Sequence, residues 1–180
     1  MKNELDIVRD VSRALLDLDV PFMLTGSMAL NYYAEPRMTR DIDIVLALAE
    51  GKVGSFVKAF ATDYYVSERS IQRALTHRSM FNIIHEESVI KVDCIVQKNG
   101  RYRDMELARR RRVQIADFET YVVSKEDLIL SKLVWAKDSR SELQLGDVRN
   151  LLATQCDQKY LDEWATELHV ESLLEECRHG

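Results

Sequence analysis

The amino-acid sequence predicts an α/β (α+β) fold in which a small mixed β-sheet is packed by helices and followed by a C-terminal helical lobe. Two observations carry this prediction. Short segments rich in Val, Ile and Phe alternate with stretches of helical apolar spacing up to residue 123, and only helical stretches follow from Ser124 onward. We therefore expect a core over residues 1–123 and a helical lobe, packed on that core, over residues 124–180.

Each predicted element has a local signal. Helices follow from apolar residues that recur every three or four positions, and strands follow from alternating or continuous apolar runs that end at Gly, Pro or polar turns. The expected helices are Glu4–Leu18, Met28–Tyr33, Gly51–Ala61, Glu68–Leu75, a helix from Ser124 through Trp135, Leu143–Ala153 and Lys159–Leu174. The expected strands are Phe22–Leu24, Asp41–Leu46, Tyr64–Val66, a hairpin of Ser79–Ile84 and Ser88–Val96, and edge strands at Val113–Ile115 and Tyr121–Val123.

Composition and charge narrow the function classes. The 180 residues carry 25 Lys and Arg against 30 Asp and Glu, a net charge of −5, and 46% of them are hydrophobic, as in ordinary globular proteins. No run of apolar residues is long enough to span a membrane, and residues 1–10 lack the core of a signal peptide. Cys94, Cys156 and Cys177 have no CxxC spacing, which argues against disulfides or structural zinc. We therefore expect a cytoplasmic protein with no membrane contact.

The strongest chemical signal is an ordered set of one Gly-Ser and three aspartates. Gly26 and Ser27 follow a predicted strand and open a helix, where a tight turn and exposed backbone N–H groups suit a phosphate. Asp41 and Asp43 are two residues apart on a strand, so their carboxylates point to the same face. Asp93 lies on another strand, and the three carboxylates converge if both strands share one sheet in the right register.

Converging carboxylates need a cation, because like charges close together disfavour ionisation. Mg²⁺ prefers such oxygen ligands and is commonly held by one or two carboxylates together with substrate phosphates. Two Mg²⁺ ions can assist an attacking hydroxyl and a leaving pyrophosphate in one displacement. We therefore expect Asp41 and Asp43 to hold the metals, and Asp93 to complete the metal site and help activate the nucleophile.

These motifs resemble the nucleotidyltransferase superfamily, whose fold is shared with DNA polymerase beta. Gly26-Ser27, Asp41-x-Asp43 and Asp93 match its three motif elements in order. Within the superfamily, the chain resembles the branch of the AbiEii-type toxins. The segments that carry this finer resemblance are Thr25–Leu30, Pro36–Asp43, Ser124–Trp135 and Asp147–Leu152.

The resemblance implies an enzyme that moves a nucleoside monophosphate from a nucleoside triphosphate (NTP) to an acceptor hydroxyl. It implies that Lys132 contacts the triphosphate and that Asp147 orients Lys132 or assists the acceptor. Arg37, in the loop before Asp41, is a further phosphate candidate. Without the resemblance, the sequence indicates only that Lys132 lies on an otherwise apolar helix.

The sequence leaves the acceptor open. A relationship to the toxins favours RNA or tRNA as acceptor and implies an antitoxin protein as partner. The run Arg109–Arg112 could bind the phosphate backbone of such an acceptor, but the favoured interpretation of this run is a solvated face. The alternatives are a small-molecule acceptor resembling an aminoglycoside, or an inactive nucleotide-binding interaction module. Lys91 could contact phosphate or pair with Asp93, and Trp135 and Trp164 are expected to pack between helices.

Overall fold

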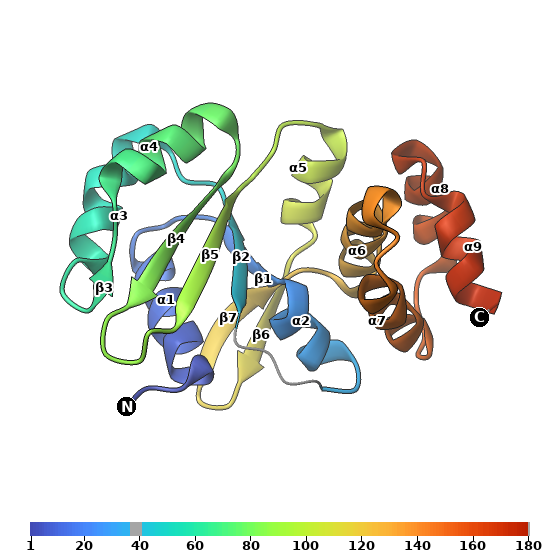
Figure 1. Ribbon diagram of the computed structural model, residues 1–180, viewed down its shortest axis with the longest axis horizontal. Coiled ribbons are helices and arrows are strands. Elements are labelled where there is room, and N and C mark those ends of the chain that lie inside the picture. Colours follow the sequence, from blue (N-terminus) through green and yellow to red (C-terminus); the bar gives the residue numbers. More distant parts are fainter. Residues whose placement is uncertain (37–40, 180) are drawn as a thin grey trace. The chain divides into compact units, whose positions relative to one another are not determined.

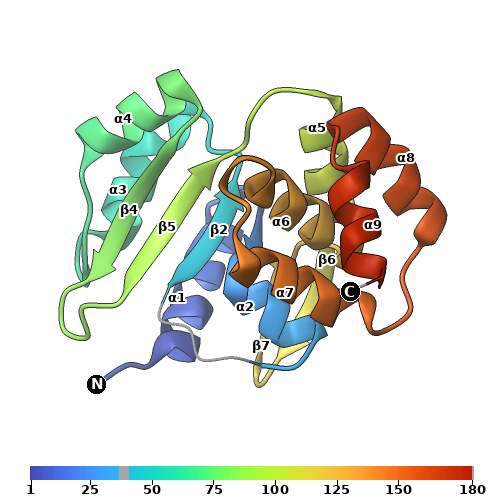
Figure 2. The same ribbon diagram turned by 45° about the vertical axis from the view of Figure 1, so that its right-hand side comes forward.

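The computed structural model describes residues 1–36 and 41–179, and its internal contacts divide the chain into two compact units. The first unit contains residues 1–28 and 41–123, and the second contains residues 29–36 and 124–179. Figures 1 and 2 show the sheet, with α1, α3, α4 and α5, in the blue to yellow part of the chain and α6 to α9 in the orange to red part.

The first unit is built on a seven-stranded mixed sheet with the strand order β3-β4-β5-β2-β1-β7-β6. β2 pairs parallel with β5 and antiparallel with β1, and β1 pairs parallel with β7. The remaining pairs, β3 with β4, β4 with β5 and β6 with β7, are antiparallel. The strands are β1 (Phe22–Thr25), β2 (Ile42–Leu46), β3 (Tyr64–Tyr65), β4 (Met80–His85), β5 (Lys91–Val96), β6 (Arg111–Ile115) and β7 (Phe118–Val122).

The helices α1, α3 and α4 of the first unit cover one face of this sheet. Ile42, Ile44 and Leu46 are fully buried, as the alternation in the sequence predicts, while Asp43 between them is half-buried. Phe81 of β4 packs edge-on against Phe56 of the helix α3, with 5.6 Å between ring centroids. The helices of this unit are α1 (Glu4–Asp17), α3 (Val53–Phe60), which follows the 3₁₀ turn Glu50–Lys52, α4 (Glu68–His77) and α5 (Arg101–Ala108).

The second unit is helical. Its helices are α6 (Lys125–Ser139), α7 (Glu142–Leu152), α8 (Gln158–Leu168) and α9 (Glu171–His179), and α2 (Gly26–Tyr33) contributes its residues from Ala29 onward. Ser124 caps α6 as predicted, because its side chain accepts a hydrogen bond from the backbone N–H of Asp127. Within the described residues, no helix combines the length and the apolar character needed to cross a bilayer.

Three details of the sequence interpretation are corrected. The predicted helix Lys159–Leu174 is two helices, since His169 adopts a left-handed conformation with φ of 57° that ends α8. Helix α5 lies in a stretch for which no helix was expected. Trp135 leaves 64% of its surface exposed, so it does not pack between helices as expected, whereas Trp164 is buried.

Candidate functional site

The strand register brings two of the predicted carboxylates to adjacent positions. Asp43 of β2 and Asp93 of β5 are direct partners in the parallel pair, so their side chains point to the same face of the sheet. This is the face opposite to the buried Ile42 and Ile44. Register partners extend the row across four strands, in the order Asn82, Asp93, Asp43 and Thr25.

Gly26 brings backbone close to the carboxylate of Asp43. A Cβ atom placed on Gly26 would lie 2.3 Å from Oδ2 of Asp43, and the residue has φ of +58°. Both features require glycine, because a side chain would overlap the carboxylate and left-handed backbone is unfavourable for other residues. The turn between β1 and α2 therefore lies directly beside the Asp43 side chain.

Asp93 is the most enclosed of the three carboxylates, with 8% of its surface exposed. Nδ2 of Asn82 donates to its Oδ1 at 2.5 Å, and the Lys91 ammonium lies 3.0 Å from its Oδ2. The hydrogen bond to Asp93 raises the pKa of Lys91, and the charges of Asp93, Asp41 and Asp43 raise this pKa further. Lys91 is therefore a charge partner of Asp93, and the charges of Asp41 and Asp43 also act on its ammonium group.

The other candidates of the first unit lie close in sequence to this row. Asp41 is exposed and directly precedes β2, two residues from Asp43. Ser27 is half-buried in the first turn of α2, next to Gly26. Arg37 lies outside the described residues.

Lys132 and Asp147 belong to the second unit, where they form a buried ion pair. Nζ of Lys132 lies 2.8 Å from Oδ2 of Asp147 and 3.0 Å from Oε1 of Gln144, and both charged side chains are over nine-tenths buried. These contacts hold the Lys132 ammonium inside the unit, with Asp147 as its counter-ion. Asp147, which the resemblance expects to orient Lys132 or assist the acceptor, is in direct contact with the Lys132 ammonium.

The carboxylate oxygens of the candidate site are ligands of the kind that Mg²⁺ prefers. Within residues 1–36 and 41–179, no three His, Cys, Asp or Glu side chains are gathered closely enough to hold a metal ion. The Asp43 and Asp93 carboxylates nevertheless point to one face from adjacent strands, and a cation, Lys91, already pairs with Asp93. One or two carboxylates together with phosphate oxygens of a nucleotide form the coordination that Mg²⁺ prefers.

Sequence reasoning missed Asn82 and Thr25, the two ends of the row. Asn82 stands in the otherwise apolar segment Phe81–Ile84, and a polar amide in a strand was the available signal. Its placement opposite Asp93 also required the register of the hairpin, which the turn around residues 85–90 sets.

The arginine run is largely engaged within the protein. Arg112 pairs with Glu119, and the Arg110 guanidinium lies 4.7 Å from the ring centre of Tyr121 and donates to the Leu107 carbonyl. Arg111 and Arg112 are exposed, as expected of a solvated face, whereas Arg109 and Arg110 are half-buried.

Three comparisons relate the chain to known proteins. The chain matches no protein-family profile, and the search of curated proteins found no match. Solved structures similar to this chain include an antigenic nucleotidyltransferase-like protein from Paracoccidioides brasiliensis, with a TM-score of 0.57, 16% identity and coverage of 96% of this chain and 92% of that chain.

Two further similar structures are antibiotic-modifying enzymes. The lincosamide antibiotic adenylyltransferase LnuA, solved with lincomycin bound, has a TM-score of 0.55 and 15% identity, over 86% of this chain and 98% of that chain. The structure of ANT(2")-Ia in complex with adenylyl-2"-tobramycin has a TM-score of 0.53 and 15% identity, over 96% of this chain and 95% of that chain. These similarities extend over most of each chain, and the protein has the fold of the nucleotidyltransferases.

Proposed function

We propose that this protein is a Mg²⁺-dependent nucleotidyltransferase, which moves a nucleoside monophosphate from an NTP to an acceptor hydroxyl and releases pyrophosphate. The observation that carries the proposal is the pairing of Asp43 with Asp93 on adjacent parallel strands, with the Gly26 turn against the Asp43 carboxylate. The shared fold and the order of the three sequence motifs support it.

The reaction is a displacement at the α-phosphorus of the NTP. The acceptor oxygen forms a new bond to this phosphorus, the bond to the bridging oxygen of the β-phosphate breaks, and pyrophosphate leaves with that electron pair. Asp93 helps to activate the acceptor hydroxyl by taking up its proton, and Asn82 and Lys91 hold the Asp93 carboxylate in place. The work of such a site consists mainly of positioning and charge stabilisation.

Asp41 and Asp43, completed by Asp93, would hold the metal ions of a two-metal site. Bound Mg²⁺ supplies positive charge to the phosphate oxygens and to the attacking and leaving oxygens. Gly26 and Ser27 offer backbone N–H groups and a hydroxyl to the triphosphate at the start of α2. Lys132 is proposed as a triphosphate contact oriented by Asp147, and Arg37 as a further one.

We place a small-molecule acceptor first. Two similar structures are adenylyltransferases of small antibiotics, and Arg110 and Arg112 are engaged within this protein. RNA or tRNA as acceptor, with an antitoxin as partner, is the second candidate. The sequence resemblance to the AbiEii-type toxins favours it.

A transfer assay tests the proposal. The purified protein is incubated with Mg²⁺ and each α-labelled NTP, with aminoglycosides, lincosamides, small hydroxylated metabolites and total RNA as separate acceptors. We expect label to move to one acceptor class and pyrophosphate to appear. Asp43→Asn should lower the rate by about 100-fold or more, since it removes a proposed metal ligand.

Asp17→Asn is the matched control, because Asp17 is an exposed aspartate at the end of α1. It should transfer label at the wild-type rate. Nucleotide binding without any transfer or pyrophosphate would instead identify the inactive binding module. Equal activity of Asp43→Asn and the wild type would contradict the proposed site.

A further inference from the structure

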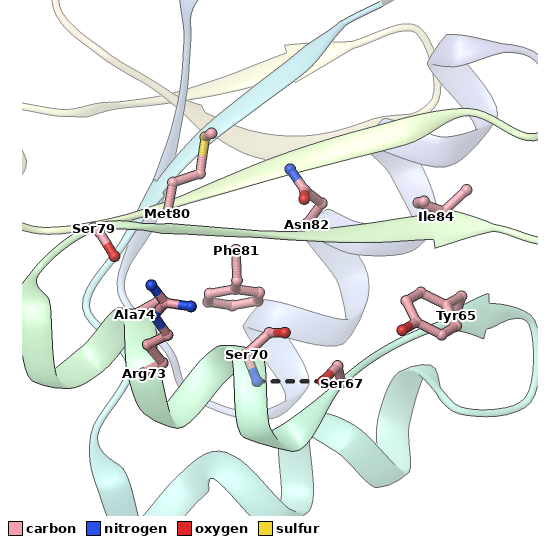
Figure 3. A pocket seen from close by; sticks show the side chains of 10 residues that line it. All are labelled: Tyr65, Ser67, Ser70, Arg73, Ala74, Ser79, Met80, Phe81, Asn82 and Ile84. Atoms are coloured by element: carbon pink, nitrogen blue, oxygen red, sulfur yellow. Dashed lines mark hydrogen bonds between the residues drawn. The ribbon is translucent and has the colours of Figure 1, made fainter.

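A cavity of about 330 Å³ lies at the edge of the sheet, between helix α4 and strand β4. Its polar lining consists of three serine hydroxyls, one phenol hydroxyl, one guanidinium and one carboxamide, from Ser67, Ser70, Ser79, Tyr65, Arg73 and Asn82. Figure 3 shows Ser70 and Arg73 on α4, with Met80 and Asn82 on the opposite side of β4 from Phe81. The volume is at the lower end of the range typical of small-molecule sites.

The edge of β4 that lines this cavity offers backbone groups. The N–H of Val96 donates to the Ser79 carbonyl, and the N–H of His85 donates to the Ile90 carbonyl. In an antiparallel pair, hydrogen-bonded positions alternate, so odd-numbered residues of β4 bond to β5 and even-numbered residues point away from it. β3 pairs only with Ile84 and His85, which leaves Met80 and Asn82 to present their peptide groups at the cavity.

The charge of the lining is unusual for this chain. The protein has 30 Asp and Glu residues, but none of the described residues that line the cavity is acidic. Arg73 makes neither a salt bridge nor a side-chain hydrogen bond in the part of the chain that the structure describes. The nearby serines add hydroxyl donors, since the bond that Ser67 Oγ accepts from the Ser70 N–H leaves its own proton available.

Asn82 connects the cavity to the candidate active site. It lines the cavity, and its Nδ2 donates to Oδ1 of Asp93, the carboxylate proposed to activate the acceptor. A molecule in contact with Asn82 is therefore separated from Asp93 by one side chain. The cavity and the row of carboxylates therefore share the Asn82 side chain.

We propose that this cavity binds the anionic group, a carboxylate or a phosphate, of a small hydroxylated acceptor. Arg73 supplies the charge, and the serine hydroxyls and edge N–H groups supply hydrogen bonds to the oxyanion. The inference rests on the proposed function and sharpens it, because a polycationic acceptor would find a like charge and no carboxylate in this cavity.

A titration with four matched compounds tests the proposal. Glycerate and glycerol 3-phosphate carry an anion on a hydroxylated three-carbon chain, glycerol is the neutral analogue, and 3-aminopropane-1,2-diol is the cationic one. At constant ionic strength, amide NMR signals of Ser70, Ser79 and Asn82 should shift with the two anions and not with the other two compounds. The ranking of the two anions identifies carboxylate or phosphate as the bound group.

Arg73→Gln should weaken the binding of the anions by about tenfold or more, as expected for the loss of a charge-assisted contact. Arg69→Gln is the matched control, because Arg69 is exposed on the same helix and does not line the cavity. Equal shifts with glycerol, or unchanged anion affinity in Arg73→Gln, would overturn the proposal.

The same titration separates this inference from the proposed function. Asp43→Asn should abolish transfer and still bind the anions, since Asp43 does not line the cavity. Anion binding in a protein that transfers no nucleotide would leave the cavity assignment standing and remove the enzyme. Efficient transfer without anion binding at these residues would remove the cavity assignment alone.

Discussion

Gly26 is the residue whose identity is most tightly set by its surroundings. Its backbone is left-handed, and the space that a side chain would fill belongs to the Asp43 carboxylate. An alanine here must strain the backbone and displace the carboxylate as well. The glycine therefore links the turn before α2 to the position of a proposed metal ligand.

We predict that Gly26→Ala lowers the free energy of unfolding by about 1–2 kcal/mol and lowers transfer activity by about 100-fold. The loss of activity should be larger than the loss of folded protein alone would cause, because a shift of about 1 Å in Asp43 misplaces the reacting groups. Urea unfolding and the transfer assay measure the two effects. Gly54→Ala, in α3 with open space around it, should retain full activity and be about 0.5 kcal/mol more stable.

At this scale the sequence predicted that Asp43 points away from the buried face of its strand but could not predict the partners of Asp43 and Asp93. The alternation around Asp43 and Asp93 is local and can be read directly from the chain. The contacts of Asp93 with Asn82, and of Gly26 with Asp43, depend on strand register and strand order. Register and strand order are tertiary properties, so the contact partner of a polar residue such as Asn82 could not be predicted from its own segment.

Among the elements, the boundary between α8 and α9 shows why a helix end was missed. Apolar spacing continues through Leu168, Leu173 and Leu174, so periodicity alone predicts one helix. The chain turns at His169, whose left-handed backbone places the N–H of Val170 on the Ala165 carbonyl. Glycine usually marks such a stop, and a histidine in this position hides the signal.

We predict that His169→Gly stabilises the protein by about 0.5–1 kcal/mol, because glycine adopts the left-handed conformation without strain. The side chain of His169 is exposed, so its removal should cost little packing. Glu163→Gly, an exposed position inside α8, should instead destabilise the protein by about 1 kcal/mol. Urea unfolding of both variants compares the effects, and equal destabilisation would show that His169 is under no strain.

For the whole molecule, ligand binding should raise the free energy of unfolding. A ligand that binds only the folded state raises the free energy of unfolding in proportion to the logarithm of its concentration. Asp43 and Asp93 are paired on adjacent strands, Asp41 lies two residues from Asp43, and Lys91 forms an ion pair with Asp93. Mg²⁺ with a nucleotide should relieve the repulsion between these carboxylates and thereby stabilise the folded state.

We predict that Mg²⁺ and a cognate NTP together raise the unfolding free energy by about 2.7 kcal/mol at 100 times the Kd, and that either ligand alone raises it far less. Asp43→Asn should unfold within about 1 kcal/mol of the wild type without ligand and gain almost nothing from Mg²⁺ and NTP. Asp17→Asn should gain as much as the wild type. Thermal unfolding at several ligand concentrations measures these shifts. A shift in Asp43→Asn equal to that of the wild type would mean that the nucleotide binds away from the paired carboxylates, because the fold would then be stabilised without them.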